Sequence, residues 1–364
     1  MQIILDFLAD VCRSALSMLN SASPWMLFSF AVAGALHEFV GAGQLKKLSV
    51  GSTKFSGVFW SVVTGMCIPI CSCGTIPLGI SLYYSGAYLG PTLTFMTSTP
   101  MINPIAIILA YGLLGPQIAT IYVLTGFFAP LLIGLVANRF AGDELYYKPA
   151  YAPEAGRKRL TLEQEKPTVR QRLRTGLRWS FTELSLTICK YTVSGMLIAG
   201  LLFTVVPQSA IQRYLGDPGV VSLLGITVVA ALMYVCAIGH IPFIAALVAS
   251  GAAPGVAITF LMAGCATNIA ELITIRKTIG PRAVALYAAM VIGISELVGY
   301  LTNRLLPNFR PVLDYDAVTR SISTANALLI EFPTWLQTLC SAVLIGYACV
   351  ALVRWLRKKG RAAA

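Results

Sequence analysis

Long apolar segments recur along almost the whole chain. They cover about residues 23–40, 56–87, 89–114, 117–138, 184–206, 219–251, 253–275, 281–303 and 326–353. A helix needs roughly 20 apolar residues to cross a bilayer. Because 57% of the residues are hydrophobic and only 12% are charged, a water-soluble globule could not hide this much apolar surface. The pattern predicts an all-α polytopic membrane protein with about eight to ten transmembrane helices, and it excludes a transmembrane β-barrel.

The positive charge is concentrated in two places. Of the 27 basic residues, nine lie between Lys148 and Arg178, and five more lie between Arg354 and Arg361. Basic residues mark the cytoplasmic loops of membrane proteins, so the net charge of +12 does not indicate a nucleic-acid partner. The nine cysteines are spread through apolar segments and do not suggest a disulfide scaffold.

The chain contains an internal repeat. When residues 71–139 are aligned without gaps on residues 236–304, 20 of the 69 positions are identical. Matched proline, glycine, asparagine and arginine residues cannot be explained by shared apolar composition. Repeated halves are typical of secondary transporters, whose substrate sites lie where the repeats meet. The repeat therefore predicts two homologous transmembrane halves.

The repeat divides the chain into five segments. We expect an N-terminal amphipathic helix over residues 1–21, a first repeat over 22–140, a basic cytoplasmic linker over 141–180, a second repeat over 181–305, and a loop, final transmembrane helix and basic tail over 306–364. Basic loops occupy non-equivalent places in the two halves, which favours inverted repeats. Inversion also requires broken or re-entrant helices within 56–114 and 219–279.

Cysteines stand beside helix-breaking residues in the first half. Cys71 and Cys73 lie between Pro69 and Pro77, and Gly74 follows them directly. Backbone groups freed inside a membrane are tolerated where they face protein or a wet cavity. Two thiols on non-helical chain can point at one centre, and thiolates select soft acids such as Cu(I), Zn(II) or trivalent arsenic. One helical turn earlier, a third sulfur is available from Cys67.

The matching segment of the second half keeps one of these thiols. Cys236 matches Cys71, whereas His240 replaces Thr75. A neutral imidazole can bind a metal or accept a proton, but it can equally cap broken backbone. Both interpretations of His240 remain open at this point.

A second pair of breaks contains matching asparagines. Asn103 lies in the segment Ser98–Pro104, after Thr99, and Asn268 occupies the same repeat position. These residues either line a pseudo-symmetric site or cap broken helices. In the second half Cys265 aligns with Pro100, and we expect it at the same level of the membrane.

Acidic residues inside apolar segments are functional candidates by default. Glu271 lies three residues after Asn268 and shares a helix face with it. It is the first candidate for proton coupling, followed by Glu296 and His240. A purely structural role for either acid is the alternative.

The pattern of cysteine, glycine and proline residues in the first half resembles the ArsP-type permease family (YraQ-like predicted permeases). The residues that carry the resemblance are Cys71-Ser72-Cys73-Gly74, Ile76-Pro77-Leu78, Ser85-Gly86, Gly90, Thr99-Pro100 and Asn103-Pro104. The resemblance covers nearly the whole chain. It implies an exporter of trivalent organoarsenicals such as methylarsenite in a bacterial or archaeal cytoplasmic membrane, with the cysteines needed for transport. A related branch is linked to efflux of copper or zinc, but this chain lacks the Cys/His-rich tail associated with that branch.

These observations predict a permease, not an enzyme, with no cofactor. Its partners are a small-molecule or metalloid substrate and the lipid bilayer. The substrate site is expected at Cys67, Cys71, Cys73, Cys236, Cys265, Thr99, Asn103 and Asn268. Under the alternative of metal efflux, Cys71, Cys73 and His240 would bind the ion. A transmembrane thiol–disulfide relay is a further alternative. Nothing resembles the nucleotide-binding pattern Gly-x-x-x-x-Gly-Lys-Ser/Thr, so an ion gradient is expected to drive transport.

Overall fold

A computed structural model gives the fold of the protein, and it describes most of the chain. The described residues are 2–39, 53–68, 70, 72–148, 168–205, 219–232, 235–249, 251–307, 309, 320–324 and 332–363. Within them the regular structure is helical, and the β-structure is one isolated bridge between Tyr88 and Tyr146. The predicted all-α fold is confirmed.

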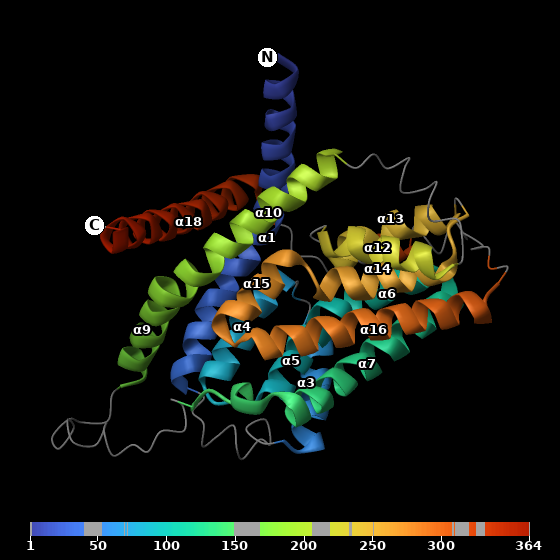
Figure 1. Ribbon diagram of the computed structural model, residues 1–364, viewed down its shortest axis with the longest axis horizontal. Coiled ribbons are helices and arrows are strands. Elements are labelled where there is room, and N and C mark those ends of the chain that lie inside the picture. The colour runs from blue at the N-terminus through green and yellow to red at the C-terminus, as the bar shows by residue number, and fades with distance from the viewer. Residues whose placement is uncertain are drawn as a thin grey trace.

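The helices of the first half are α1 (Gln2–Phe39), α3 (Phe55–Cys67), α4 (Ser72–Tyr84), α5 (Leu89–Met101), α6 (Pro104–Leu113) and α7 (Gly115–Phe140). The second half contains α9 (Val169–Trp179), α10 (Ser185–Val205), α12 (Val220–Leu232), α13 (Ala237–Ala249), α14 (Pro254–Ala266), α15 (Ile269–Thr278) and α16 (Pro281–Leu305). A π-helical turn, Ser180–Leu184, joins α9 to α10, and α18 (Thr334–Ala363) ends the chain. Figure 1 shows α7 and α16 side by side, with α5 and α14 among the elements around them.

Helix boundaries repeat along the chain with a constant offset. Each of α3, α4, α5 and α6 has the same length as its counterpart α12, α13, α14 or α15, and the bounds differ by 165 residues in every case. The turn after α4 is repeated as well, since Gly86 has φ +105° and Gly251 has φ +104°. A residue with a Cβ is strained in this left-handed region. The structure therefore contains the predicted duplication.

Two homologous helices form the centre of the bundle. Every residue of α5 and every residue of α14 is buried. Each central helix crosses its neighbour closely, because a Cβ added at Gly90 would lie 2.4 Å from the Gly134 oxygen, and one at Gly255 would lie 2.0 Å from the Gly299 oxygen.

Side-chain hydrogen bonds also join the helices at these two crossings, α5 with α7 and α14 with α16. The Gly90 amide donates to Asn138 Oδ1 at 2.9 Å, and the Gly255 amide donates to Asn303 Oδ1 at 2.7 Å. In each half a threonine hydroxyl also donates to a carbonyl of the long helix, at 3.1 Å in both cases. The backbones can approach this closely because glycine has no side chain.

The last helices of the two repeats, α7 and α16, lie side by side and antiparallel, so that the end of each is close to the start of the other. Glu144, four residues after the end of α7, accepts from the amides of Arg282 and Ala283 in the first turn of α16, at 3.2 and 2.6 Å. At the other end Phe309, four residues after the end of α16, lies 3.7 Å from the position of a Cβ at Gly115, where α7 begins. Residues 144 and 309 are themselves 165 positions apart. This reciprocal contact supports inverted repeats; their orientation in a bilayer stays a prediction.

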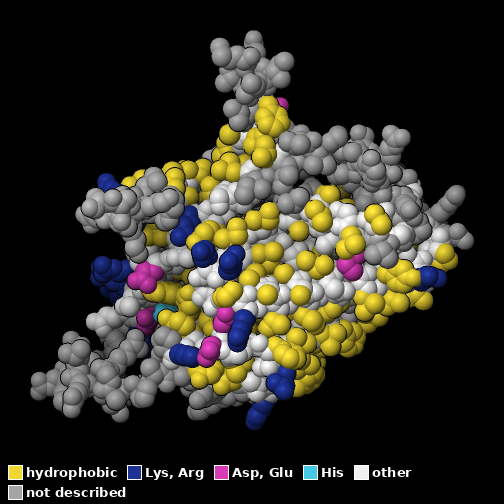
Figure 2. Space-filling view, viewed as in Figure 1, with side chains coloured by type: hydrophobic (Ala, Val, Ile, Leu, Met, Phe, Trp, Pro, Cys, Tyr) yellow, Lys and Arg dark blue, Asp and Glu magenta, His cyan; other side chains and the backbone are white. Residues whose placement is uncertain are grey.

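Several helices are long and apolar enough to cross a membrane. By length and composition, four described segments qualify, namely Gly115–Phe140, Pro254–Thr278, Pro281–Leu305 and Thr334–Arg354. The pair α5 and α6, bent by 43°, would make a fifth. The larger number expected from the sequence included segments that the structure breaks into helices of 10–13 residues. Figure 2 shows hydrophobic side chains over much of the visible surface, with most charged side chains toward one end.

The predicted segment boundaries after residues 21 and 180 both fall within continuous helical backbone. A single helix, α1, covers both the amphipathic segment predicted for residues 1–21 and the apolar segment that follows. The last part of the predicted linker 141–180 is helical and forms α9, which begins with a capping box of Thr168 and Gln171. Residues 149–167 lie outside the described residues. The functional division at these boundaries stays a prediction.

Candidate functional site

The two central spans break at matching asparagines. Asn103 caps α6, and its Oδ1 accepts from the Ala106 amide at 2.8 Å. Asn268 caps α15, and its Oδ1 accepts from the Glu271 amide at 2.9 Å. Both asparagines are at most 2% exposed. The interpretation of these residues as helix caps is confirmed, whereas contact with a substrate stays a prediction.

The residue whose amide is capped differs between the repeats: it is Ala106 in the first and the acidic Glu271 in the second. The carboxyl group of Glu271 is completely buried. Asn268 Nδ2 donates to Oε2 at 3.1 Å, and the Tyr287 hydroxyl donates to Oε1 at 3.2 Å. Ion pairs found in the described part of the chain join Arg13 to Asp10 and Lys148 to Asp143, so neither neutralises Glu271.

These contacts act on Glu271 in opposite directions. Two donors stabilise an ionised carboxylate, whereas complete burial disfavours the charge. A carboxyl group held in such a balance can exchange a proton when its surroundings change. Tyr287 also lies within electrostatic range of Thr97 on α5, so the group that holds Glu271 is close to the other repeat.

Tyr122 occupies the position in α7 that Tyr287 occupies in α16. Both tyrosines are completely buried. The Tyr122 hydroxyl donates to the carbonyl of Met101, the last residue of α5, and thus satisfies backbone at the helix break. Sequence reasoning did not single out these tyrosines, although they are one of the identities in the repeat alignment.

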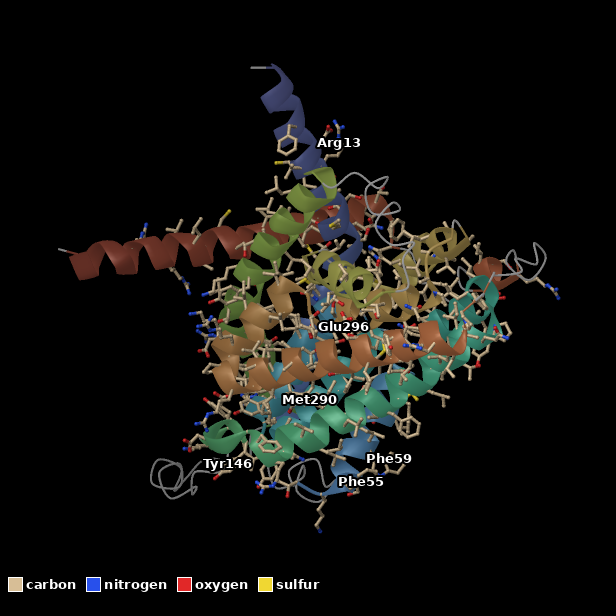
Figure 3. All side chains as sticks on the ribbon, turned by 45° about the vertical axis from the view of Figure 1, so that its right-hand side comes forward. Arg13, Phe55, Phe59, Tyr146, Met290 and Glu296 are labelled. Carbon is tan, nitrogen blue, oxygen red and sulfur yellow. The ribbon has the colours of Figure 1, made fainter. Side chains whose placement is uncertain are left out.

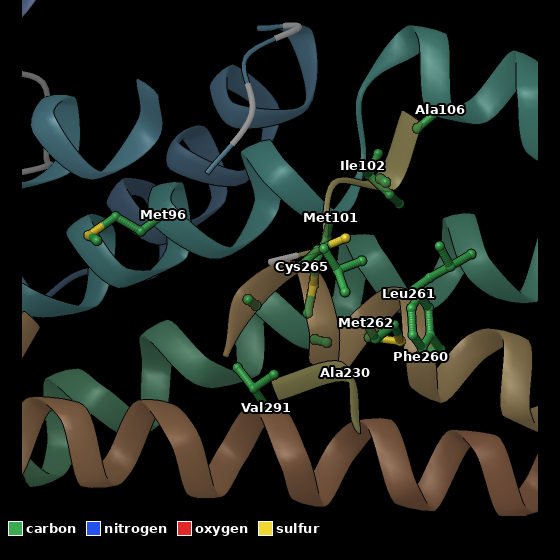
Figure 4. Packing of buried hydrophobic residues seen from close by; sticks show 14 of the residues in the cluster. Met96, Met101, Ile102, Ala106, Ala230, Phe260, Leu261, Met262, Cys265 and Val291 are labelled. Atoms are coloured by element: carbon green, nitrogen blue, oxygen red, sulfur yellow. The ribbon is translucent and has the colours of Figure 1, made fainter. Parts of the chain in front are cut away.

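Two second-half cysteines lie close to this centre. Cys236 and Cys265 are both within electrostatic range of Tyr122, and Cys265 is also within range of Glu271. Cys265 is completely buried, and Cys236 is partly buried just before α13. Figure 4 shows Cys265 beside Met101 and Ile102, where α5 ends. The structure thus brings these predicted site residues to one level of the bundle.

His240 holds broken backbone in place. Its ring Nδ1 lies 3.2 Å from the Cys236 amide nitrogen and 3.0 Å from the Cys236 carbonyl oxygen. These contacts support the interpretation of His240 as a backbone cap. Among the described residues there is no group of three or more His, Cys, Asp or Glu side chains that could hold a metal ion.

The cysteine motif of the first half lies at the break between α3 and α4. Cys67 is the last residue of α3 and is exposed. Cys73 lies in the first turn of α4, because the helix already begins at Ser72. Cys71 and the side chain of Cys73 lie outside the described residues. A common centre for the two thiols therefore stays a prediction.

Two other predicted site residues make hydrogen bonds outside the group around Glu271. The Thr99 hydroxyl donates to the Phe95 carbonyl of its own helix at 2.8 Å. Glu296 lies on α16, where the Thr227 hydroxyl donates to its Oε1. Glu296 is thus separate from the hydrogen bonds around Glu271.

Comparisons with known proteins agree with this arrangement. The sequence pattern of a family described as predicted permeases, the ArsP-type family, matches residues 8–304. The chain belongs to the ArsP-type family of predicted permeases. The match includes both repeats and thus the whole centre formed by the broken spans. A permease is therefore the established class of this multi-pass membrane protein.

Two curated relatives of the chain come from an archaeon and a bacterium. UPF0718 protein MJ0584 of Methanocaldococcus jannaschii is 25% identical over 334 residues, which cover 77% of this chain and 91% of the relative. UPF0718 protein YcgR of Bacillus subtilis is 26% identical over 281 residues, with 77% and 92% covered. No solved structure matches the chain.

Proposed function

We propose that this permease exports trivalent organoarsenicals from the cytoplasm and is driven by protons. The observation that carries the proton coupling is the completely buried Glu271, held by Asn268 and Tyr287 at the break of a central span. Ionisable residues at such positions are typical of proton relays in transporters. Broken helices near the midplane are typical sites of substrate and ion binding.

The cysteines supply the substrate preference. Trivalent arsenic is a soft acid that binds thiols, and methylarsenite also carries a methyl group suited to an apolar pocket. Cys71 and Cys73 are the proposed primary thiols, with Cys67, Cys236 and Cys265 as further sulfur ligands. Thr99, Asn103 and Asn268 would line the same route between the repeats.

Movement of one repeat against the other would expose the site to each side of the membrane in turn. Protonation of Glu271 would weaken its attraction for the two donors, and release of the proton would restore it. Because Tyr287 lies within electrostatic range of Thr97 on α5, this change would act where the two repeats approach each other. We place the protein in the cytoplasmic membrane of a bacterium or archaeon.

The test uses everted membrane vesicles that take up methylarsenite under an imposed pH gradient. Wild type is expected to accumulate the arsenical, and Cys71→Ser and Cys73→Ser are expected to lose accumulation. Glu271→Gln should abolish accumulation against a gradient but keep the fold, since the Asn268 cap accepts from the backbone amide of residue 271 and not from its side chain. Cys349→Ser, at an exposed position of α18, is the matched control and should transport normally.

Other substrates give different results in the same vesicles. Accumulation of Cu(I) or Zn(II) without methylarsenite would assign the protein to metal efflux. A relay of reducing equivalents would require Cys236. If the vesicles reduced disulfides and Cys236→Ser abolished this activity, electron transfer would replace transport as the function. Methylarsenite accumulation that survives in all the cysteine variants would overturn the thiol-based proposal.

A further inference from the structure

Glu296 lies deep within a membrane-spanning helix. It is residue 16 of the 25 in α16, one of the segments able to cross a bilayer. Arg304, near the end of the helix, is eight residues further on, or about 12 Å along the axis at 1.5 Å per residue. If Arg304 lies at the membrane surface, Glu296 lies near the middle of a hydrocarbon core about 30 Å thick.

The surroundings of Glu296 differ from those of Glu271. Leu297 is 58% exposed, and on the neighbouring helix Val228 is 59% and Leu224 49% exposed. Glu296 itself is only partly buried, and Figure 3 shows it on α16 between the labelled Met290 and the far end of the helix. The carboxyl group is thus at the apolar outer surface formed by α12 and α16.

The two oxygens of Glu296 are in unequal positions. Oε1 accepts from the Thr227 hydroxyl, whereas Oε2 is shielded and has no hydrogen-bond partner among the described residues. An unpaired ionised oxygen in an apolar environment is strongly disfavoured, because the charge has lost its water and gained no donor. A proton on Oε2 removes this charge and leaves the Thr227 hydrogen bond intact.

Among the described residues, no ion pair joins Glu296 to a basic side chain. Within the described residues, α12 contains no titratable side chain, and α14 contains only the buried Cys265. On α7, Arg139 lies at the end that meets the start of α16. The remaining ionisable groups of α16 on the same side are Tyr300 and Arg304, one and two turns from Glu296.

These two residues connect Glu296 with the end of the helix. Residues 296, 300 and 304 share one face because they are four positions apart. Arg304 donates to the Tyr300 hydroxyl from Nε at 3.1 Å and from Nη2 at 2.8 Å. Tyr300 therefore keeps its own proton available, and Arg304 is exposed.

We propose that Glu296 is a second proton-binding site, separate from Glu271, which lies beside the lipid-facing surface and is reached from the C-terminal end of α16. Its ligand is a proton, and its chemical signature is reaction with a hydrophobic carbodiimide. In that reaction the carboxyl proton moves to a carbodiimide nitrogen while the carboxyl oxygen adds to the central carbon. The resulting O-acylisourea rearranges to a stable N-acylurea, and no group leaves.

The experiment treats the full-length protein in lipid nanodiscs with dicyclohexylcarbodiimide and locates the adduct by mass spectrometry. Glu296 is expected to be modified at least about tenfold more than Glu183, an exposed acid before α10. A water-soluble carbodiimide with an amine should reverse this order. Glu296→Gln should remove the hydrophobic adduct, while the matched variant Glu183→Gln should retain it.

Two results would overturn the proposal. Preferential modification of Glu296 by the water-soluble reagent would show an ionised group facing water. No hydrophobic adduct at Glu296 would show that the carboxyl group is covered, by another copy or by another part of the chain. Because labelling needs neither substrate nor transport, failure of the proposed organoarsenical export would leave this result unaffected.

Discussion

Tyr122 and Tyr287 occupy the same position in the two repeats, but their hydroxyl groups have different partners. Tyr122 donates to the backbone carbonyl of Met101, and Tyr287 donates to the side chain of Glu271. Glu271 stands where the first repeat has Ala106, so one acidic substitution accounts for the difference. The two repeats thus share this local structure but differ by one titratable group.

Removing these two hydroxyls should have different consequences. Tyr287→Phe deletes one donor to Glu271 and should change the pH dependence of transport in vesicles. Tyr122→Phe, the matched control, should keep that pH dependence but lower the stability by about 1–3 kcal/mol, because it leaves the Met101 carbonyl unpaired. Identical pH profiles for wild type and Tyr287→Phe would contradict a role for this contact in proton coupling.

The close crossing of α14 and α16 should make Gly255 intolerant of a methyl group. A Cβ at Gly255 would lie 2.0 Å from the Gly299 oxygen, whereas one at Gly225 would have no atom within 4 Å. We expect Gly255→Ala to destabilise the protein by about 1–3 kcal/mol and Gly225→Ala to leave it nearly unchanged. Apparent melting temperatures in detergent measure the difference, and equal values for both variants would argue against the tight crossing of α14 and α16.

The cap at the start of α16 should contribute to stability. Glu144→Ala removes a carboxylate that accepts from two amides at a helix N-terminus, and the expected loss is about 0.5–2 kcal/mol. Glu144→Gln should lose less, because its amide oxygen can still accept. The comparison uses the same melting assay, with Asp143→Ala as a control at an exposed site. No destabilisation in Glu144→Ala would contradict the cap.

Thiol reactivity should follow burial. In detergent, Cys67 is expected to react with N-ethylmaleimide at least about tenfold faster than Cys265, because the first is exposed and the second is completely buried. Mass spectrometry of partially labelled protein gives both rates. Equal rates would mean that the centre between the repeats is open to solvent for much of the time.

The sequence allowed the membrane class, the duplication and the helix breaks to be predicted, because apolar length and matched prolines and asparagines are local signals. The cap function of Asn268 and its proximity to Glu271 follow from a spacing of three residues. The partner of Glu271 could not be predicted this way, since Tyr287 lies on another helix and contact depends on how α15 and α16 pack. The same is true of Glu144, whose contact with α16 joins residues 138 positions apart.

Hydroxyl groups on α5 have a consequence for motion. Among the described residues, Thr92, Thr97 and Thr99 each donate to a carbonyl one turn earlier along the chain, whereas Thr94 donates to α7. The first three hydroxyls would therefore stay hydrogen-bonded if α5 shifted against the second repeat. Because Thr94 and Asn138 join α5 to α7, we expect these two helices of the first repeat to move together.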